Sequence, residues 1–180
     1  MTQQKKRIGI LTSGGDCAGL NAAIRAATYA AIERGWEVIG ILDSTCGLMV
    51  EPFRTITLTK EAVDGAMMRS AGTILGTTSK GSNSPLNYPM PDGTKKDRSI
   101  DFANAYHNLG LSGLIVIGGD GSMRIAAKLH AAGIPRVIGV PKTIDNDVLG
   151  TDVTFGFDTA VSIATEAIDR LHTTTEAHER

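Results

Sequence analysis

Residues 114–122, Leu-Ile-Val-Ile-Gly-Gly-Asp-Gly-Ser, join a short apolar run directly to a glycine-rich turn. The same order occurs twice more: apolar residues 8–11 precede a Thr-Ser-Gly-Gly-Asp turn, and apolar residues 137–140 precede a Pro-Lys-Thr-Ile-Asp-Asn-Asp stretch. A segment of helical character follows each turn. Short apolar strands that alternate with helices are typical of a parallel sheet covered on both faces. The pattern therefore predicts an α/β fold.

The spacing of apolar residues places the expected helices. The first spans about residues 18–34, the second ends near Gly133, the third spans about residues 157–171, and residues 101–109 form a shorter helix. One buried face is expected on the first helix and one on the third, formed by Leu20, Ile24, Ala27 and Ala31 and by Ala160, Ile163, Ala167 and Leu171. With a further strand at residues 38–42, we expect a Rossmann-like domain of three layers, with a mainly parallel sheet and helices on both faces.

The three polar turns are expected to lie together. Because parallel strands end at the same edge of a sheet, and ligands bind at that edge, the turns form one candidate site. Residues 70–99 are rich in small polar residues. We interpret them as a loop that either covers this site as a mobile lid or is a plain surface excursion.

Composition and charge argue against several classes of protein. The 180 residues suffice for one domain, and the formal net charge of −1 argues against a nucleic-acid or anionic-membrane partner held by bulk charge. No apolar run approaches the ~20 residues of a membrane span, and residues 8–11 are too short for the apolar region of a signal peptide. Cys17 and Cys46 lack metal-ligand spacing and are expected to be reduced thiols in the cytoplasm.

In the first turn, Gly14 and Gly15 let the backbone approach a ligand closely, and they precede a helix. Backbone N–H groups and the helix dipole favour a phosphate at such a place. Residues 14–19 fit the spacing G-x-x-x-x-G, but Leu20 and Asn21 follow where a P-loop has Lys and Ser or Thr. A tight strand-to-helix turn is the alternative explanation of these glycines.

The second turn places Asp120 among three glycines, with Ser122 after them, at the start of a helix. The glycines indicate phosphate oxygens bound by backbone amides, but a carboxylate repels phosphate. The combination is explained if Mg²⁺, which typically binds one or two carboxylates and substrate phosphates, joins the two. We therefore expect Asp120 to be a magnesium ligand, directly or through water. A helix N-cap is the alternative role.

The third turn, residues 141–147, contains two carboxylates, a hydroxyl, an amide and an ammonium group. An ordinary polar loop after a strand is one explanation. In the other, Asp145 or Asp147 takes a hydroxyl proton, and Thr143 and Lys142 bind or neutralise phosphate. The residues thus predict a Mg²⁺-dependent phosphotransferase with an alcohol acceptor. They leave open the acceptor and the choice between the two carboxylates.

Four motifs, residues 11–16, 19–25, 118–122 and 141–147, together resemble the 6-phosphofructokinase family. They have the family's order and spacing, and the similarity continues through residues 150–171. The resemblance implies transfer of a phosphoryl group to the 1-hydroxyl of fructose 6-phosphate, which gives fructose 1,6-bisphosphate in glycolysis.

The resemblance also implies a role for each matching residue. Asp145 is the expected base, with Asp147, Thr143 and Lys142 in the same catalytic set, and Asp120 is the expected magnesium ligand. The donor's phosphates are expected on Gly14, Gly15, Gly119, Asp120, Gly121 and Ser122, and on Lys80, which stands in for an arginine of the family's ATP enzymes. The sugar phosphate is expected on Thr143, Ile144, Asp145 and Arg180. Because the family supplies the last of these across a subunit interface, the resemblance implies a homodimer or homotetramer.

Two positions bear on the phosphoryl donor. Pyrophosphate-using members of the family typically carry Asp at the position of Gly121, where it repels the α-phosphate of ATP, and Lys at the position of Lys142. This chain combines the open Gly121 with the lysine. We expect ATP as donor, because a steric block is harder to evade than an added cation is to tolerate. Pyrophosphate is the alternative.

The family's pattern continues beyond the position of Arg180. The chain, residues 1–180, is therefore expected to be the N-terminal nucleotide- and magnesium-binding domain of a phosphofructokinase, without the smaller sugar-phosphate domain. A fragment, a truncated gene product and a separate domain are all compatible with this length. A non-catalytic nucleotide-binding module is the alternative function.

Overall fold

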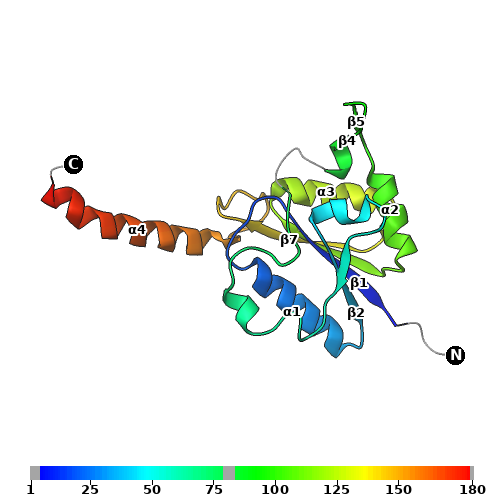
Figure 1. Cartoon of the computed structure of the whole chain (residues 1–180), viewed down its shortest axis with the longest axis horizontal. Coiled ribbons are helices and arrows are strands. Elements are labelled where there is room, and N and C mark those ends of the chain that lie inside the picture. Colours follow the sequence, from blue (N-terminus) through cyan, green and yellow to red (C-terminus); the bar gives the residue numbers. More distant parts are fainter. Residues whose placement is uncertain (1–4, 79–83, 179–180) are drawn as a thin grey trace.

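The computed structural model describes residues 5–78 and 84–178, and its centre is a six-stranded sheet (Figure 1). The strand order is β3-β2-β1-β6-β7-β8. The strands are β1 (Arg7–Ser13), β2 (Glu37–Ile41), β3 (Thr55–Thr57), β6 (Gly113–Gly118), β7 (Val137–Thr143) and β8 (Phe155–Gly156). The pair β2–β3 is antiparallel and the other pairs of this sheet are parallel. The predicted, mainly parallel sheet is confirmed.

Helices cover both faces of the sheet. The α-helices are α1 (Leu20–Glu33), α2 (Ser99–Asn108), α3 (Asp120–Ala131) and α4 (Phe157–Ala177). Short 3₁₀ helices, η1 (Ser44–Leu48), η2 (Ala66–Arg69) and η3 (Pro85–Asn87), lie in the connections, and β4 (Tyr88–Pro89) pairs with β5 (Lys95–Lys96) in a separate hairpin. Figure 1 shows α1 on one side of the sheet and α2 and α3 on the other, which confirms the three layers.

Two hydrophobic cores lie on the two faces. Successive side chains of a strand point to opposite faces. Accordingly, Ile10 of β1 packs in one core with Leu20 of α1, whereas Leu11 packs in the other with Phe102 of α2. Burying such a side chain contributes about 1.5–3 kcal/mol. The predicted face of α1 is confirmed, because its members are buried in, or packed against, one core: Leu20, Ile24, Ala27 and Ala31.

β7 is longer than the apolar run that predicted it. It continues three residues past Val140, with Pro141 opposite Gly118 of β6. The proline is tolerated there because β8 pairs only with Lys142 and Thr143, so Pro141 has a strand partner on one side. Lys142 and Thr143 are therefore buried strand residues and not loop residues.

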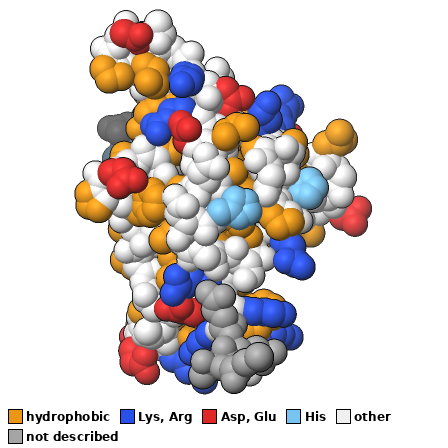
Figure 2. Space-filling view, turned by 90° about the vertical axis from the view of Figure 1, so that its right-hand side faces the viewer, with side chains coloured by type: hydrophobic (Ala, Val, Ile, Leu, Met, Phe, Trp, Pro, Cys, Tyr) orange, Lys and Arg blue, Asp and Glu red, His pale blue; other side chains and the backbone are white. Residues whose placement is uncertain are grey.

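The predicted buried face of the third helix is wrong. No described residue of α4 is buried, and Ile163 and Leu171 are 62% and 61% exposed. Figure 1 shows α4 leaving the body of the molecule, so nothing in the described chain covers its apolar side. By contrast, the face in Figure 2, on the side away from α4, carries charged side chains of both signs between small apolar areas.

The first part of the predicted loop is packed against the sheet. Leu75 is buried, Thr12 Oγ1 donates to the carbonyl of Gly76 at 2.6 Å, and the side chain of Asn21 bonds the backbone of Ser70 and Ile74. Residues 79–83 lie outside the described residues, and the rest of the loop forms η3 and the hairpin. Within residues 5–78 and 84–178, no helix has the length and apolarity to cross a membrane.

We predict that Gly118→Ala destabilises the fold. A Cβ at this position would lie 2.6 Å from the backbone oxygen of Ser13 and would also meet the side chain of Ser122. Overpacking of this kind costs about 1–3 kcal/mol, to be measured by urea unfolding. Gly65→Ala is the matched control, because its Cβ would meet no atom within 4 Å and its φ is −66°. Equal free energies of unfolding for the two variants would contradict the packing described for Gly118.

Candidate functional site

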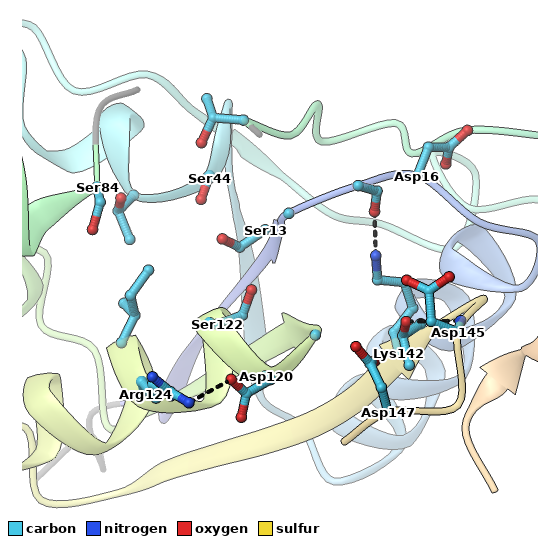
Figure 3. A pocket seen from close by; sticks show the side chains of 18 of the residues that line it. Ser13, Asp16, Ser44, Ser84, Asp120, Ser122, Arg124, Lys142, Asp145 and Asp147 are labelled. Carbon is cyan, nitrogen blue, oxygen red and sulfur yellow. Dashed lines mark hydrogen bonds and ion pairs between the residues drawn. The ribbon is translucent and has the colours of Figure 1, made fainter. Parts of the chain in front are cut away.

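A cavity of about 710 Å³ lies at the carboxyl ends of β1, β6 and β7 (Figure 3). Residues of all three polar turns line it: Ser13, Gly14, Gly15 and Asp16; Gly119, Asp120, Gly121 and Ser122; and Lys142, Thr143, Ile144, Asp145 and Asp147. The prediction that the three turns meet at one edge is thus confirmed. Lys80 and Arg180 lie outside the described residues.

The first turn is fixed by hydrogen bonds and not by the helix that follows it. Gly14 has a φ of +86°, which favours glycine. Its N–H donates to the carbonyl of Thr78 at 3.1 Å, and Thr77 Oγ1 donates to its carbonyl at 2.5 Å. Helix α1 begins only at Leu20, after Gly19, and neither residue lines the cavity. The argument from the α1 dipole therefore fails for this turn.

The second turn does place a helix N-terminus at the cavity. Helix α3 begins at Asp120, and its first residues line the cavity together with Gly119. Gly119 is the N-cap and no side chain caps the helix, so the alternative role of Asp120 as an N-cap is excluded. A Cβ at Gly121 would meet no atom within 4 Å, so this position leaves open space.

Hydrogen bonds within the third turn and to other parts of the chain hold it in place. Lys142 is buried, and its Nζ donates to the carbonyl of Gly15, which ties this turn to the first one. Thr143 Oγ1 accepts a hydrogen bond from the N–H of Asp145 at 3.0 Å. Asn146, with a φ of +51°, accepts the N–H of Thr154 on its side-chain oxygen at 3.0 Å. These contacts fix the backbone that carries two exposed carboxylates at the cavity (Figure 3).

The cavity carries more negative than positive charge. Its described lining includes four carboxylates, Asp16, Asp120, Asp145 and Asp147, but only two cations, Arg124 and Lys142. In the described part of the chain, no group of three or more His, Cys, Asp or Glu side chains could hold a metal ion. The donor set fits Mg²⁺ held by one carboxylate and by the phosphates of a ligand, and it does not fit a cage built from protein alone.

Several lining residues were not predicted from the sequence. Arg124 belongs to α3, and its Nη2 lies 3.0 Å from Asp120 Oδ2. Its position four residues after a candidate metal ligand on a helix was a usable signal. The others come from η1, from residues around η3, from the end of the loop after η2 and from α3: Ser44 and Thr45; Ser84, Leu86 and Asn87; Thr78; and Ile125.

A buried thiol lies beside the first turn. Cys17 Sγ donates to the carbonyl of Ala18 at 3.2 Å. Burial raises the pKa of the Cys17 thiol; the positive charge of Lys142 opposes this and the negative charge of Asp16 adds to it. The thiol therefore senses the charges of two turns of the candidate site.

Comparisons with known proteins identify similar chains. A family model described as phosphofructokinase matches residues 7–180. The ATP-dependent 6-phosphofructokinase 1 of Synechocystis sp. is 54% identical over 176 residues, which are 97% of this chain and 48% of the relative. An ATP-dependent 6-phosphofructokinase of Chloroflexus aggregans is 52% identical over 181 residues, covering 100% of this chain and 49% of the relative. The chain thus spans about half the length of the curated relatives that it matches.

Solved structures agree with this result. The phosphofructokinase of Saccharomyces cerevisiae superposes with a TM-score of 0.76 at 28% identity, over 98% of this chain and 25% of that one. A pyrophosphate-dependent phosphofructokinase of Nitrosospira multiformis gives a TM-score of 0.70 at 21% identity, over 91% of this chain and 42% of that one. At that identity the second likeness concerns the fold alone.

We predict that the Cys17 thiol makes the fold less stable as the pH rises from 7 to 10. Because its pKa is raised in the folded chain, the folded state keeps a proton that the unfolded state has lost, and the free energy of unfolding falls with pH. This group can contribute at most about 1.4 kcal/mol per pH unit. Urea unfolding of wild type and Cys17→Ala measures it; equal pH dependence of the two would contradict the assignment.

Proposed function

Because the chain belongs to the phosphofructokinase family, we propose that it is the nucleotide- and magnesium-binding part of a 6-phosphofructokinase. The reaction transfers the terminal phosphoryl group of ATP to the 1-hydroxyl of fructose 6-phosphate and gives fructose 1,6-bisphosphate. The observation that carries this proposal is the convergence of three turns on one cavity, with Asp120 on one side and Asp145 and Asp147 on the other (Figure 3).

ATP is the proposed donor. The names of the relatives at 52–54% identity say that they depend on ATP. The open space at Gly121 leaves room for an α-phosphate. Lys142, the feature shared with pyrophosphate-using members, is buried and bonded to the carbonyl of Gly15, so a protein group already occupies its ammonium. Pyrophosphate remains the alternative donor.

Asp120 is the proposed magnesium ligand. Four carboxylates around the cavity would repel a polyphosphate, so a phosphate donor needs added positive charge to bind there. Mg²⁺ bound with the nucleotide neutralises phosphate charge during transfer. The first turn of α3 offers backbone N–H groups to phosphate oxygens from the same side of the cavity.

Asp145 is the proposed base. It takes the proton of the sugar's 1-hydroxyl as that oxygen forms a bond to the terminal phosphorus, and the bond from that phosphorus to the bridging oxygen of ADP breaks. Thr143 acts by holding the N–H of Asp145 and so fixing the carboxylate's backbone. Asp147 and Ile144 line the same cavity, and Ile144 is proposed to contact the sugar phosphate together with Arg180.

The exposed side of α4 is proposed to be covered by the second domain of the intact enzyme. In the described chain, eight of the eleven exposed large hydrophobic side chains lie between Ile138 and Leu171. The curated relatives are about twice as long as this chain, so they contain a further part that could pack against such a surface.

We propose further that the intact enzyme is a cytoplasmic homo-oligomer, without nucleic-acid or membrane partners.

The donor proposal predicts binding of nucleotide to the chain itself. By isothermal titration calorimetry, MgATP should bind, ATP in excess EDTA should bind at least tenfold more weakly, and magnesium pyrophosphate should bind more weakly than MgATP. A coupled assay with fructose 6-phosphate shows whether the chain alone turns over. Binding of MgATP without turnover supports the alternative of a nucleotide-binding module. Binding of magnesium pyrophosphate in preference to MgATP would refute ATP as the donor.

The base assignment predicts that, in the intact enzyme, Asp145→Asn lowers kcat by about 10²- to 10⁴-fold. Its affinity for MgATP should stay within about twofold, because the carboxylate is assigned to the acceptor and not to the donor. Asp158→Asn, an exposed carboxylate of α4 that does not line the cavity, is the control and should keep both values. An unchanged kcat in Asp145→Asn would contradict the assignment of Asp145 as the base and would leave Asp147 as the candidate.

A further inference from the structure

Arg124 occupies a place in the cavity that neither the sequence motifs nor the proposed reaction uses. It lies one helical turn after Asp120 on α3, lines the cavity, and forms an ion pair with Asp120 in which Nη2 and Oδ2 are 3.0 Å apart. Figure 3 shows the two side chains side by side on the helix, across the cavity from Asp145 and Asp147. Arg124 is 77% exposed, so its guanidinium can change partner without repacking a core.

The ion pair is easily exchanged. An exposed pair at positions i and i+4 of a helix contributes only about a factor of two to an equilibrium. Lys142, the other cation of the described lining, is buried and bonded to Gly15. Arg124 is therefore the one exposed cation that the described lining offers to an incoming phosphate.

A divalent cation and Arg124 compete for the same carboxylate. If Asp120 binds Mg²⁺, the guanidinium loses its partner and stands beside another positive charge, which repels it. The phosphates that bind with the metal are then the anions nearest to the guanidinium. A planar guanidinium can donate hydrogen bonds to two phosphate oxygens at once. The exchange thus replaces a weak ion pair by a stronger, two-pronged contact.

We propose that Arg124 is the counter-ion of Asp120 only while no metal ion is bound, and that it passes to a phosphate of the donor when Mg²⁺ takes the carboxylate. This inference rests on the proposed function, because it assumes a phosphate donor in the cavity. It makes donor binding conditional on the metal in two ways. Without Mg²⁺, Asp120 repels the phosphates and also withholds the arginine that would bind them.

A double-mutant cycle tests the inference by binding and not by activity. Asp120→Asn, Arg124→Gln and the double variant are titrated with ATP in EDTA and with MgATP by calorimetry. Arg124→Gln should weaken MgATP binding about tenfold, the loss expected for one charge-assisted contact. In EDTA, Arg124→Gln should change little in the wild-type background but should weaken ATP binding at least fivefold in the Asp120→Asn background, where the arginine is free to bind phosphate.

Arg170→Gln is the matched control. Arg170 on α4 is also 77% exposed and is also paired at i and i+4, with Glu166, but it does not line the cavity. It should leave both affinities unchanged. Circular dichroism and urea unfolding establish that each variant folds.

Two results separate failure of this inference from failure of the proposed function. If the wild-type chain does not bind MgATP, both are refuted. If it does, and Arg124→Gln binds MgATP as tightly as Arg170→Gln does, only the role of Arg124 is refuted. The role of Arg124 is also refuted if, in EDTA, Arg124→Gln weakens ATP binding equally in the wild-type and Asp120→Asn backgrounds. The Asp120 carboxylate then does not keep the arginine from the phosphates.

Discussion

The register of three parallel strands is the constraint on which the site depends. Ser13 of β1 lies opposite Gly118 of β6, and Gly118 lies opposite Pro141 of β7. The three strands therefore reach the same level, and the turns that follow them open into one cavity. Gly118, in the middle, has backbone and side-chain atoms so close that no Cβ fits. A slip of one residue would turn every side chain of a strand to the other face and separate the turns.

The two cations of the described cavity lining, Lys142 and Arg124, have different surroundings and different roles. Lys142 is buried and serves the protein, because it ties the third turn to the carbonyl of Gly15. Arg124 is exposed and paired only with Asp120 on its own helix. One cation thus shapes the cavity and the other remains exchangeable. The remaining carboxylates, Asp16, Asp145 and Asp147, line a space that repels phosphate unless a metal ion binds with it.

The sequence predicted β1, β2, β6 and β7, the three turns and their meeting at one edge, because short apolar runs and glycine-rich turns are local signals. It did not predict the short edge strands β3 and β8, which have three and two residues. It did not predict that β7 continues through Pro141. Proline has no N–H to donate, so its position in a sequence suggests a strand end even where, as here, no neighbouring strand needs that N–H. It predicted a face on α4 but not its exposure, because periodicity reports which side is apolar and not what covers it. Arg124 was missed because it lies outside the motifs, although its spacing of four residues from Asp120 on a helix was a usable signal.

The continuity of β7 has a consequence for how such a chain can vary in length. The hairpin of β4 and β5 lies outside the main sheet, so residues gained or lost there do not change the register of the main sheet. Insertion of one residue between Val137 and Lys142 would displace Asp145 along the sheet edge. It would also turn the side chains of the two buried residues, Lys142 and Thr143, to the opposite faces of the sheet. Variation in length is therefore expected to accumulate at the hairpin and to be purged from the seven residues of β7.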